Sequence, residues 1–236
     1  MKKFFASGSC RLLTTINTGR DKLLPIHSMY QNFIGTNFLG KFHNTKQHIQ
    51  FIEWILEKKE LPLSISENFF THVSKSHLRI HGGKRDNIDF QIKRKNIRDN
   101  FDSCDCFIFE LCSIKKYELD GFQVQHELCN NYKNSIQSEQ EIYNDLLYLL
   151  TLLPSNKKII FQCHFRPNII YNDKSKAIKN REIIYNILKK LCDNNDQLVL
   201  HDPSDIIKND HSIYDGNTHW NGKGHKKNFN KILELV

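Results

Sequence analysis

Two side chains able to act as nucleophiles stand next to each other near the start of the chain. Ser9 and Cys10 follow the apolar run at 4–6 and a bend at Gly8, and the fixed cation Arg11 comes next. A strand that ends in this way presents reactive groups at the carboxyl edge of a parallel sheet, where ligands bind because the turn carries free backbone N–H groups. Glycine at the bend lets a substrate approach closely. The segment predicts a nucleophile at a sheet edge; an ordinary strand-to-turn junction is the alternative.

A base and an acid suited to such a nucleophile lie close together near the other end of the chain. Asp215 precedes His219 by four residues within the segment YDGNTHWNGKGH. A carboxylate beside an imidazole can orient the ring through one nitrogen while the other nitrogen faces a nucleophile. The segment follows the last expected strand and precedes the last expected helix, so it also belongs at the carboxyl edge of the sheet. Together the two ends of the chain predict nucleophilic catalysis.

The elements that would position these groups alternate between strands and helices. Strands are expected at 4–6, 105–111, 158–163 and 197–201, and helices at 45–59, 135–153, 175–192 and 222–236. Less regular patterns predict a long loop or broken helix at 11–42, a short helix at 67–74, and a strand or hairpin near 88–92. Strands separated by helices of this length pair in parallel through right-handed crossovers. The sequence therefore predicts a three-layer α/β/α fold with a mainly parallel sheet, as a single domain over residues 1–236.

The composition indicates a globular chain with a basic charge balance. Hydrophobic residues make up 39% of the chain and charged residues 25%, and the formal net charge is +8. A basic chain favours anionic partners. The basic residues form only short, scattered patches, so a dedicated nucleic-acid surface is disfavoured. No apolar run approaches transmembrane length, and the N-terminal apolar stretch is too short for a signal peptide, so we expect a cytoplasmic protein with no membrane partner.

The cysteines and histidines do not follow the spacing of metal ligands. The seven cysteines, an odd number, lie mostly inside apolar runs, which fits reduced and buried thiols. Cys104, Cys106 and Cys112 are close in sequence, but their spacing is not the paired C-x2-C of structural zinc, and an alternating strand would bury all three on one face. The other histidines, including His43 and His48, are expected on the surface or in loops. No metal site is predicted.

The two chemical blocks resemble those of the SGNH (GDSL-type) hydrolase superfamily. In that superfamily the first strand runs into a G-x-S block, and an Asp and a His share a C-terminal D-x-x-H block. Gly-Ser-Cys at 8–10 falls where G-D-S would be, and residues 215–219 fall where D-x-x-H would be. The opening block resembles that of the bacterial family named for its GSCFA stretch, and Thr-His-Trp at 218–220 is similar to the alginate-type O-acetyltransferase branch. The resemblance implies an SGNH-hydrolase-like, flavodoxin-like fold.

The resemblance leaves two catalytic assignments open. Counting from the glycine of the first block, the nucleophile position falls on Cys10 and Ser9 takes the middle place, so Cys10 is favoured over Ser9. A thiolate is also the better intrinsic nucleophile, and a helix N-terminus favours the thiolate form. Because His219 follows Asp215 by four residues rather than three, either Asp215 or Asn217 is expected to orient the His219 ring.

Residues for the oxyanion hole and the substrate are expected where the superfamily carries its middle blocks. His164, Arg166 and Asn168 follow one expected strand, and Glu110 ends another. Asn168 or His164 would donate to a developing oxyanion, together with a backbone N–H beside the nucleophile. Arg11 and Arg166 would suit an acidic sugar or the phosphates of acetyl-CoA. Alternatively, Asn168 only caps a turn, and Glu110 pairs with Arg11 or Arg166.

The function that the resemblance implies is acyl transfer through a covalent acyl-enzyme, by an esterase or O-acetyltransferase acting on carbohydrate. Acetyl-CoA would be the acyl donor of a transferase, and neither a further cofactor nor a metal is required. Two other classes stay open. One is a non-catalytic SGNH-like module that binds glycan, favoured because the chain lacks the glycine of the superfamily's second block and the G-x-N-D motif of its third. The other is a nucleic-acid-associated protein, favoured only by net charge. Neither explains why a nucleophile and an Asp–His pair stand at opposite ends of one α/β chain.

Overall fold

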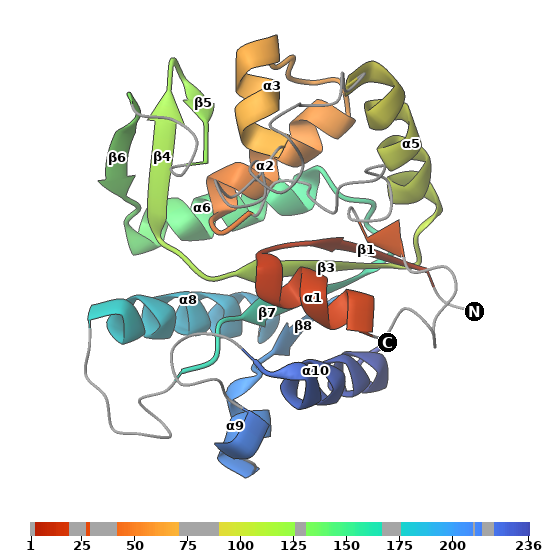
Figure 1. Ribbon diagram of the computed structural model, residues 1–236, viewed down its shortest axis with the longest axis vertical. Coiled ribbons are helices and arrows are strands. Elements are labelled where there is room, and N and C mark those ends of the chain that lie inside the picture. The colour runs from red at the N-terminus through yellow and green to blue at the C-terminus, as the bar shows by residue number, and fades with distance from the viewer. Residues whose placement is uncertain are drawn as a thin grey trace, which may run out of the picture.

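The structure, a computed structural model, describes residues 3–18, 27–28, 42–70, 90–125, 131–166, 176–209, 211–213 and 220–236. A five-stranded sheet runs between two sets of helices (Figure 1). Its strands, in their order across the sheet, are β2 (His27–Ser28), β1 (Phe4–Ser7), β3 (Cys106–Leu111), β7 (Lys158–Cys163) and β8 (Leu198–His201). Every neighbouring pair is parallel. Counted along the chain, this is the 2-1-3-4-5 order of doubly wound folds, and it confirms the predicted three-layer α/β/α class with a flavodoxin-like parallel sheet.

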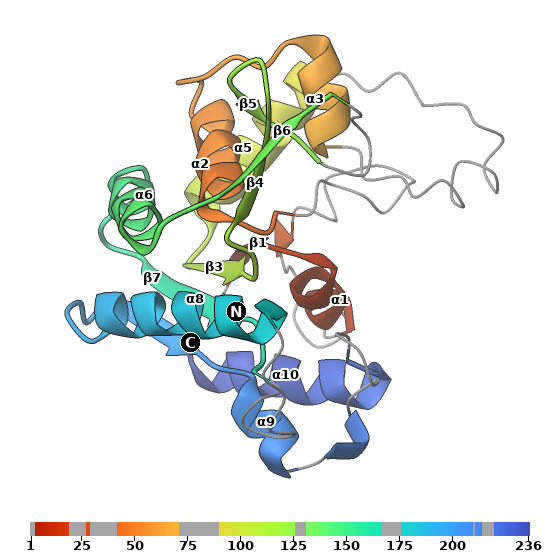
Figure 2. The same ribbon diagram turned by 90° about the vertical axis from the view of Figure 1, so that its left-hand side faces the viewer.

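The side chains of β3 alternate between two helical layers. Phe107 and Phe109 belong to the larger apolar cluster, whereas Cys106 and Ile108 belong to the smaller one. The larger cluster takes side chains from α2 (Thr45–Ile55), α3 (Leu63–Phe70), α5 (Phe90–Ser103), α6 (Glu139–Thr151) and α8 (Lys176–Cys192). On the other face α1 (Cys10–Thr18) and α10 (Gly222–Glu234) lie side by side (Figure 2). Burial on both faces explains why β3 reads as a continuous apolar run.

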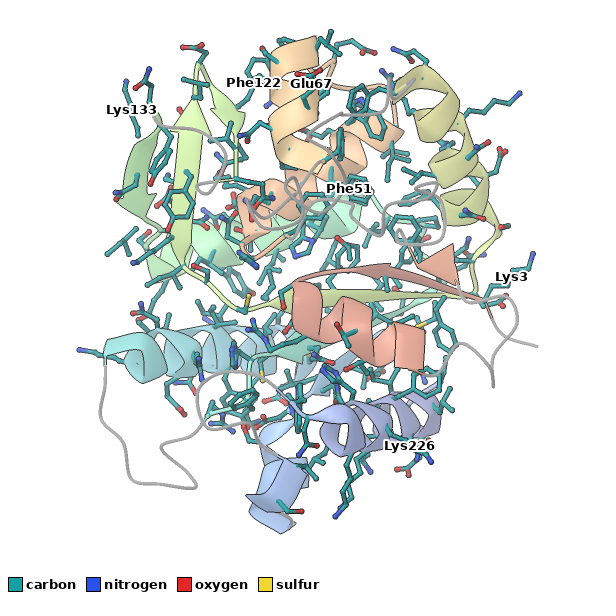
Figure 3. All side chains as sticks on the ribbon, viewed as in Figure 1. Lys3, Phe51, Glu67, Phe122, Lys133 and Lys226 are labelled. Atoms are coloured by element: carbon teal, nitrogen blue, oxygen red, sulfur yellow. The ribbon has the colours of Figure 1, made fainter. Side chains whose placement is uncertain are left out.

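Aromatic rings fill the larger cluster. Phe51 of α2, labelled in Figure 3, is fully buried, and its ring centroid lies 4.9 Å from that of Phe42 and 6.1 Å from that of Phe5. Contacts of this kind contribute about 0.5–1.5 kcal/mol each beyond the burial of apolar area. Because Phe5 belongs to β1, this packing fixes the strand that leads into Ser9.

A second, antiparallel sheet was not predicted from the sequence. It consists of β5 (Phe122–Gln123), β4 (Lys115–Leu119) and β6 (Lys133–Ile136), in that order, and it lies between β3 and α6 in the chain. Asp120 and Gly121 join β4 to β5 with φ angles of 51° and 80°. Asp-Gly is the preferred sequence for a two-residue hairpin turn with positive φ at both positions. The hairpin signal was therefore present in the chain.

Several helices and strands begin or end at other residues than the sequence predicts, in part because of the second sheet and of helix capping. Helix α6 begins at Glu139 rather than at 135, since β6 precedes it and Ser138 caps it through a capping box with Glu141. Asn44 caps α2 by accepting from the backbone N–H of Gln47. The expected strand or hairpin near 88–92 is wrong for residues 90–92, which lie in α5. Of the two alternatives expected for 11–42, a long loop or a broken helix, α1 bears out a helix as far as residue 18.

The thiols and one histidine also differ from expectation. Cys104 packs in the larger cluster and Cys106 in the smaller, because Cys104 precedes β3 instead of alternating within it. Cys112 is only half-buried. His48 is wholly buried on α2 rather than on the surface. Within the described ranges, no helix has the length and apolar character that crossing a bilayer requires.

Candidate active site

The first turn of α1 lies between β1 and β3, where the winding of the sheet reverses: β2 is added on one side of β1, and β3 and the later strands on the other. In doubly wound sheets the crevice outside the carboxyl ends of these two strands is the usual ligand site. Ser7 ends β1, Gly8 makes the bend, and Ser9 precedes the first helical residue, Cys10. The backbone N–H of Arg11 donates to Ser9 Oγ at 3.3 Å, as expected for a helix N-cap. The backbone of Cys10 is described, whereas its side chain lies outside the described part.

The side chain of Glu110 reaches this turn from β3 and is only 1% exposed. Its Oε2 accepts hydrogen bonds from Ser9 Oγ, from the backbone N–H of Ser9 at 2.9 Å and from that of Leu12 at 3.4 Å. Its Oε1 forms an ion pair with Arg11 Nε at 3.2 Å. A negative charge at a helix N-terminus is stabilised by the exposed N–H groups and the helix dipole. Of the two arginines considered as partners of Glu110, Arg11 is therefore the one it contacts.

The close approach of β3 to the bend requires glycine at position 8. A Cβ atom there would lie 2.7 Å from Glu110 Cβ and 3.0 Å from Leu12 Cδ2. The backbone N–H of Phe42 donates to the Gly8 carbonyl oxygen at 3.1 Å and closes the bend from the other side. Ser9 itself is fully buried. Its hydroxyl caps α1 and donates to Glu110, so the contacts of Ser9 are those of a structural residue in this conformation.

Arg166, which follows β7, is held by two carboxylates. Its guanidinium donates to Asp202 and to Glu182 Oε1, the latter at 2.8 Å, and stacks 3.5 Å from the ring centroid of Tyr185. Burial acts to lower the pKa of Arg166, but the hydrogen bond and charge of Asp202 raise it on balance. Burial acts to raise the pKa of Asp202, but hydrogen bonds from Ser204 and Arg166 lower it on balance. The cluster ties the ends of β7 and β8 to α8.

His164 follows β7 directly, two residues before Arg166, and it is buried. Its Nδ1 lies 3.1 Å from the carbonyl oxygen of Phe165, and the two rings are 4.4 Å apart between centroids. Asn168, the other residue predicted for the oxyanion hole, lies outside the described residues. So do Asp215, Asn217 and His219, the residues predicted as the acid and the base.

The segment that carries Asp215 and His219 leaves and rejoins the described fold beside the end of β7. The backbone N–H of Asn221 donates to the Ile213 carbonyl oxygen at 3.0 Å, which joins the two sides of the segment 214–219. Trp220, which directly follows this segment, is buried with its ring centroid 5.4 Å from that of Phe165. A Cβ atom at Gly224 would lie 2.7 Å from both the Ile213 oxygen and the Trp220 ring.

A buried polar row beneath α1 and α10 was not predicted. Glu110, Gln162 and His201 occupy paired positions on three neighbouring strands, and all three are at most 3% exposed. Asn228 of α10 accepts from His201 Nε2 at 2.7 Å and donates to Gln162 Oε1 and to Thr15 Oγ1 of α1, both at 3.3 Å. Burial lowers the pKa of His201. A polar residue at or next to the carboxyl end of each apolar strand was the available signal.

Within the described ranges, no group of three His, Cys, Asp or Glu side chains is arranged to hold a metal ion. Of the predicted site residues, the structure brings together Ser9, Arg11 and Glu110 at the start of α1, and His164 and Arg166 at the end of β7.

Comparison with known proteins found no family model and no curated protein that matches the chain.

Proposed function

We propose that the protein transfers an acyl group through a covalent acyl-enzyme formed on Cys10. The observation that supports this most directly is the position of Cys10, which opens α1 at the carboxyl edge of β1 where the winding of the sheet reverses. Its neighbour Ser9 is fully buried and donates its hydroxyl to Glu110, which favours Cys10 over Ser9. A helix N-terminus also favours the thiolate, the reactive form of cysteine.

The reaction would run in two balanced steps. The sulfur of Cys10 attacks the carbonyl carbon of an ester or thioester while His219 takes the thiol proton, and the leaving alcohol or thiol receives that proton as the carbon–oxygen or carbon–sulfur bond breaks. Water or an acceptor hydroxyl then attacks the thioester carbonyl carbon and loses its proton to His219. The carbon–sulfur bond to Cys10 breaks, the sulfur takes that proton, and the free acid or the new ester leaves. Asp215 or Asn217 would orient the His219 ring. Ile213 and Trp220, which flank this segment, pack beside Phe165 at the end of β7 and support its assignment to the same sheet edge.

The substrate class follows from the resemblance to SGNH enzymes: an acetylated or acetylatable carbohydrate, with acetyl-CoA as the donor if the enzyme is a transferase. Asn168 or His164 and a backbone N–H beside Cys10 would stabilise the oxyanion. Arg11 and Arg166 are both paired with carboxylates, so their charges are already compensated. The proposal therefore does not depend on either arginine for an acidic substrate.

Intact-protein mass spectrometry tests the proposal. The wild type is incubated with p-nitrophenyl acetate and, separately, with acetyl-CoA, beside Cys10→Ala, Ser9→Ala and His219→Ala. A gain of one acetyl group that disappears in Cys10→Ala and persists in Ser9→Ala and in the control Cys112→Ala, whose thiol is half-buried, is the expected result. Formation of the adduct should be much slower in His219→Ala. No adduct on folded wild type, or loss of the adduct in Ser9→Ala alone, would overturn the assignment.

A non-catalytic glycan-binding module is the second candidate. The backbone N–H groups of Ser9 and Leu12 donate to Glu110. Donors at a helix N-terminus otherwise stabilise an anion from outside the chain, such as a developing oxyanion. Because these two donors are already used, the site favours binding over catalysis. This candidate predicts binding to an acetylated polysaccharide that survives alkylation of Cys10, together with no acetyl adduct.

A further inference from the structure

The carboxylate of Glu110 occupies the position in which parallel α/β folds bind external anions. It lies at the N-terminus of α1, buried, and it bridges β3 to the segment that follows β1. In this protein the anion is supplied by the chain itself, from the strand on the opposite side of the reversal point. We propose that Glu110 is a positioning residue: its carboxylate is a built-in anion that holds the first turn of α1 and thereby sets where Cys10 is presented.

A carboxylate is required here because both of its oxygens act only as acceptors. Oε2 receives two donors from Ser9 and one from Leu12, and Oε1 receives Arg11 Nε. Glutamine in the same place would keep one acceptor oxygen and turn an NH2 group toward a donor, since an amide nitrogen carries two hydrogens and accepts none. It would also remove the negative charge that pairs with Nε of the buried Arg11.

The packing leaves little freedom for an alternative arrangement. Glu110 Cβ would be only 2.7 Å from a Cβ at position 8, so the strand and the bend are in contact through backbone and side chain alike. Removing the Glu110 side chain by substitution with glycine would leave a space lined by the N–H groups of Ser9 and Leu12, the Ser9 hydroxyl and the Arg11 guanidinium. A small carboxylate such as formate carries the charge and the two oxygens that this set of donors recognises.

Chemical rescue by formate tests the inference, which rests on the proposed role of Cys10 for one of its two readouts. The first readout is the melting temperature of wild type, Glu110→Gly and Glu110→Gln, measured in sodium formate and in sodium chloride of equal ionic strength. The second is the initial rate of acetyl transfer to Cys10. We expect formate to raise the melting temperature of Glu110→Gly by about 3 °C over chloride, through binding to the native state alone. Wild type and Glu110→Gln, in which the space is filled, should show no such gain.

The rate of acetylation of Cys10 distinguishes positioning from anchoring. It should fall at least tenfold in Glu110→Gly and recover with formate in step with the melting temperature. Thermal rescue without any change in the rate would mean that Glu110 only anchors α1, and no thermal rescue would mean that no anion site exists; either result overturns the inference. If wild type itself forms no adduct, the proposed function fails, and iodoacetamide alkylation of Cys10 replaces acetylation: its rate should differ at least threefold between wild type and Glu110→Gly and return with formate.

Ser9→Ala keeps the test decisive if Glu110→Gly does not fold. This substitution removes one donor to the carboxylate and the N-cap oxygen that accepts from the Arg11 N–H, and it removes no atom of the apolar core. The variant should retain the Cys10 adduct but form it several times more slowly than wild type, because the first turn of α1 loses one of its ties to β3. An unchanged rate in folded Ser9→Ala would count against positioning through this contact.

Discussion

Ser7 Oγ lies 2.8 Å from His48 Nδ1, and His48 Nε2 lies 3.0 Å from the carbonyl oxygen of Glu110. Because a carbonyl oxygen can only accept, the proton of the neutral ring resides on Nε2, and Ser7 must donate its hydroxyl proton to Nδ1. The pair thus has the contacts of a serine–histidine dyad. Both residues are fully buried between β1 and α2, however, and the dyad joins the ends of β1 and β3.

Ser7→Ala should therefore destabilise the fold without affecting acyl transfer. The substitution leaves His48 Nδ1 buried without a donor, which is expected to lower the free energy of unfolding by about 1–2 kcal/mol. Urea denaturation measures this loss, and mass spectrometry of the acetylated protein measures the adduct on Cys10. An adduct that vanishes in folded Ser7→Ala would identify Ser7 as the nucleophile instead of Cys10.

His48 should make the protein lose stability on mild acidification. Burial lowers the pKa of His48 to about 4, from an ordinary value of 6.5. Above pH 6.5 the ring is neutral in both states; below it the unfolded chain binds a proton that the native state excludes, so stability falls as the pH drops from 6.5 toward 4. Between pH 7 and pH 5 the free energy of unfolding should decrease by about 2 kcal/mol from His48 alone. His201, whose pKa burial also lowers, acts in the same direction.

Urea titrations at pH 7, 6 and 5 measure this dependence, in a range above that in which most carboxylates titrate. The matched variant is His48→Gln, whose side chain can accept and donate but does not titrate. It should be less stable than wild type at pH 7 and have a shallower pH dependence. Equal slopes in the two proteins would show that His48 does not exclude a proton in the native state.

Four strands of the central sheet were predictable because strands buried on both faces need a nearly continuous apolar run, whereas the two-residue β2 was not predicted. β3 and β7 were found for that reason, and β7 with its observed bounds. The small sheet was missed since β6 is exposed at all four positions and reads as a polar loop. The bounds of α1 were not predicted, and a long loop stayed open beside a broken helix, because nine residues containing three threonines form a weak helix alone. Packing of Leu12 and Ile16 against α10 stabilises it.

The candidate site was predictable in part. Glu110 stood out from the sequence as a charged residue in an apolar strand, and Arg11 was one of two partners considered for it. What the sequence does not contain is strand register. Only the pairing of Glu110 with Gln162, and of Gln162 with His201, aligns the polar ends of three strands into one row on the α1 side.

Two glycines of α10 provide a matched test of the packing around segment 214–219. A Cβ atom at Gly224 would lie 2.7 Å from the Ile213 carbonyl oxygen and the Trp220 ring, whereas one at Gly222 would meet nothing within 4 Å. Gly224→Ala should lower the free energy of unfolding by about 1–3 kcal/mol through overpacking and should also slow acetylation of Cys10, because Trp220 follows His219 in the chain. Gly222→Ala should be neutral or up to about 1 kcal/mol more stable.

Urea denaturation and adduct kinetics on both variants separate the two effects. An equal loss of stability in Gly222→Ala and Gly224→Ala would contradict the close packing at position 224. A stability loss in Gly224→Ala with an unchanged rate of acetylation would indicate that the segment 214–219 takes no part in the reaction. It would then argue against His219 as the base.

Asn228 holds the buried polar row together, and its removal should be costly. Its amide accepts from His201 and donates to Gln162 and Thr15, so alanine would leave three buried polar groups with one partner fewer. The expected loss in the free energy of unfolding is about 2–4 kcal/mol, from unsatisfied groups and the cavity together. Asn230, exposed two residues further along the same helix, provides the control, and Asn230→Ala should change stability by no more than about 0.5 kcal/mol. If urea denaturation gave similar values for both variants, the hydrogen bonds of Asn228 would contribute no net stability. The apolar contacts between α1 and α10 and the hydrogen bond between Thr15 and His225 would then hold α1 in place.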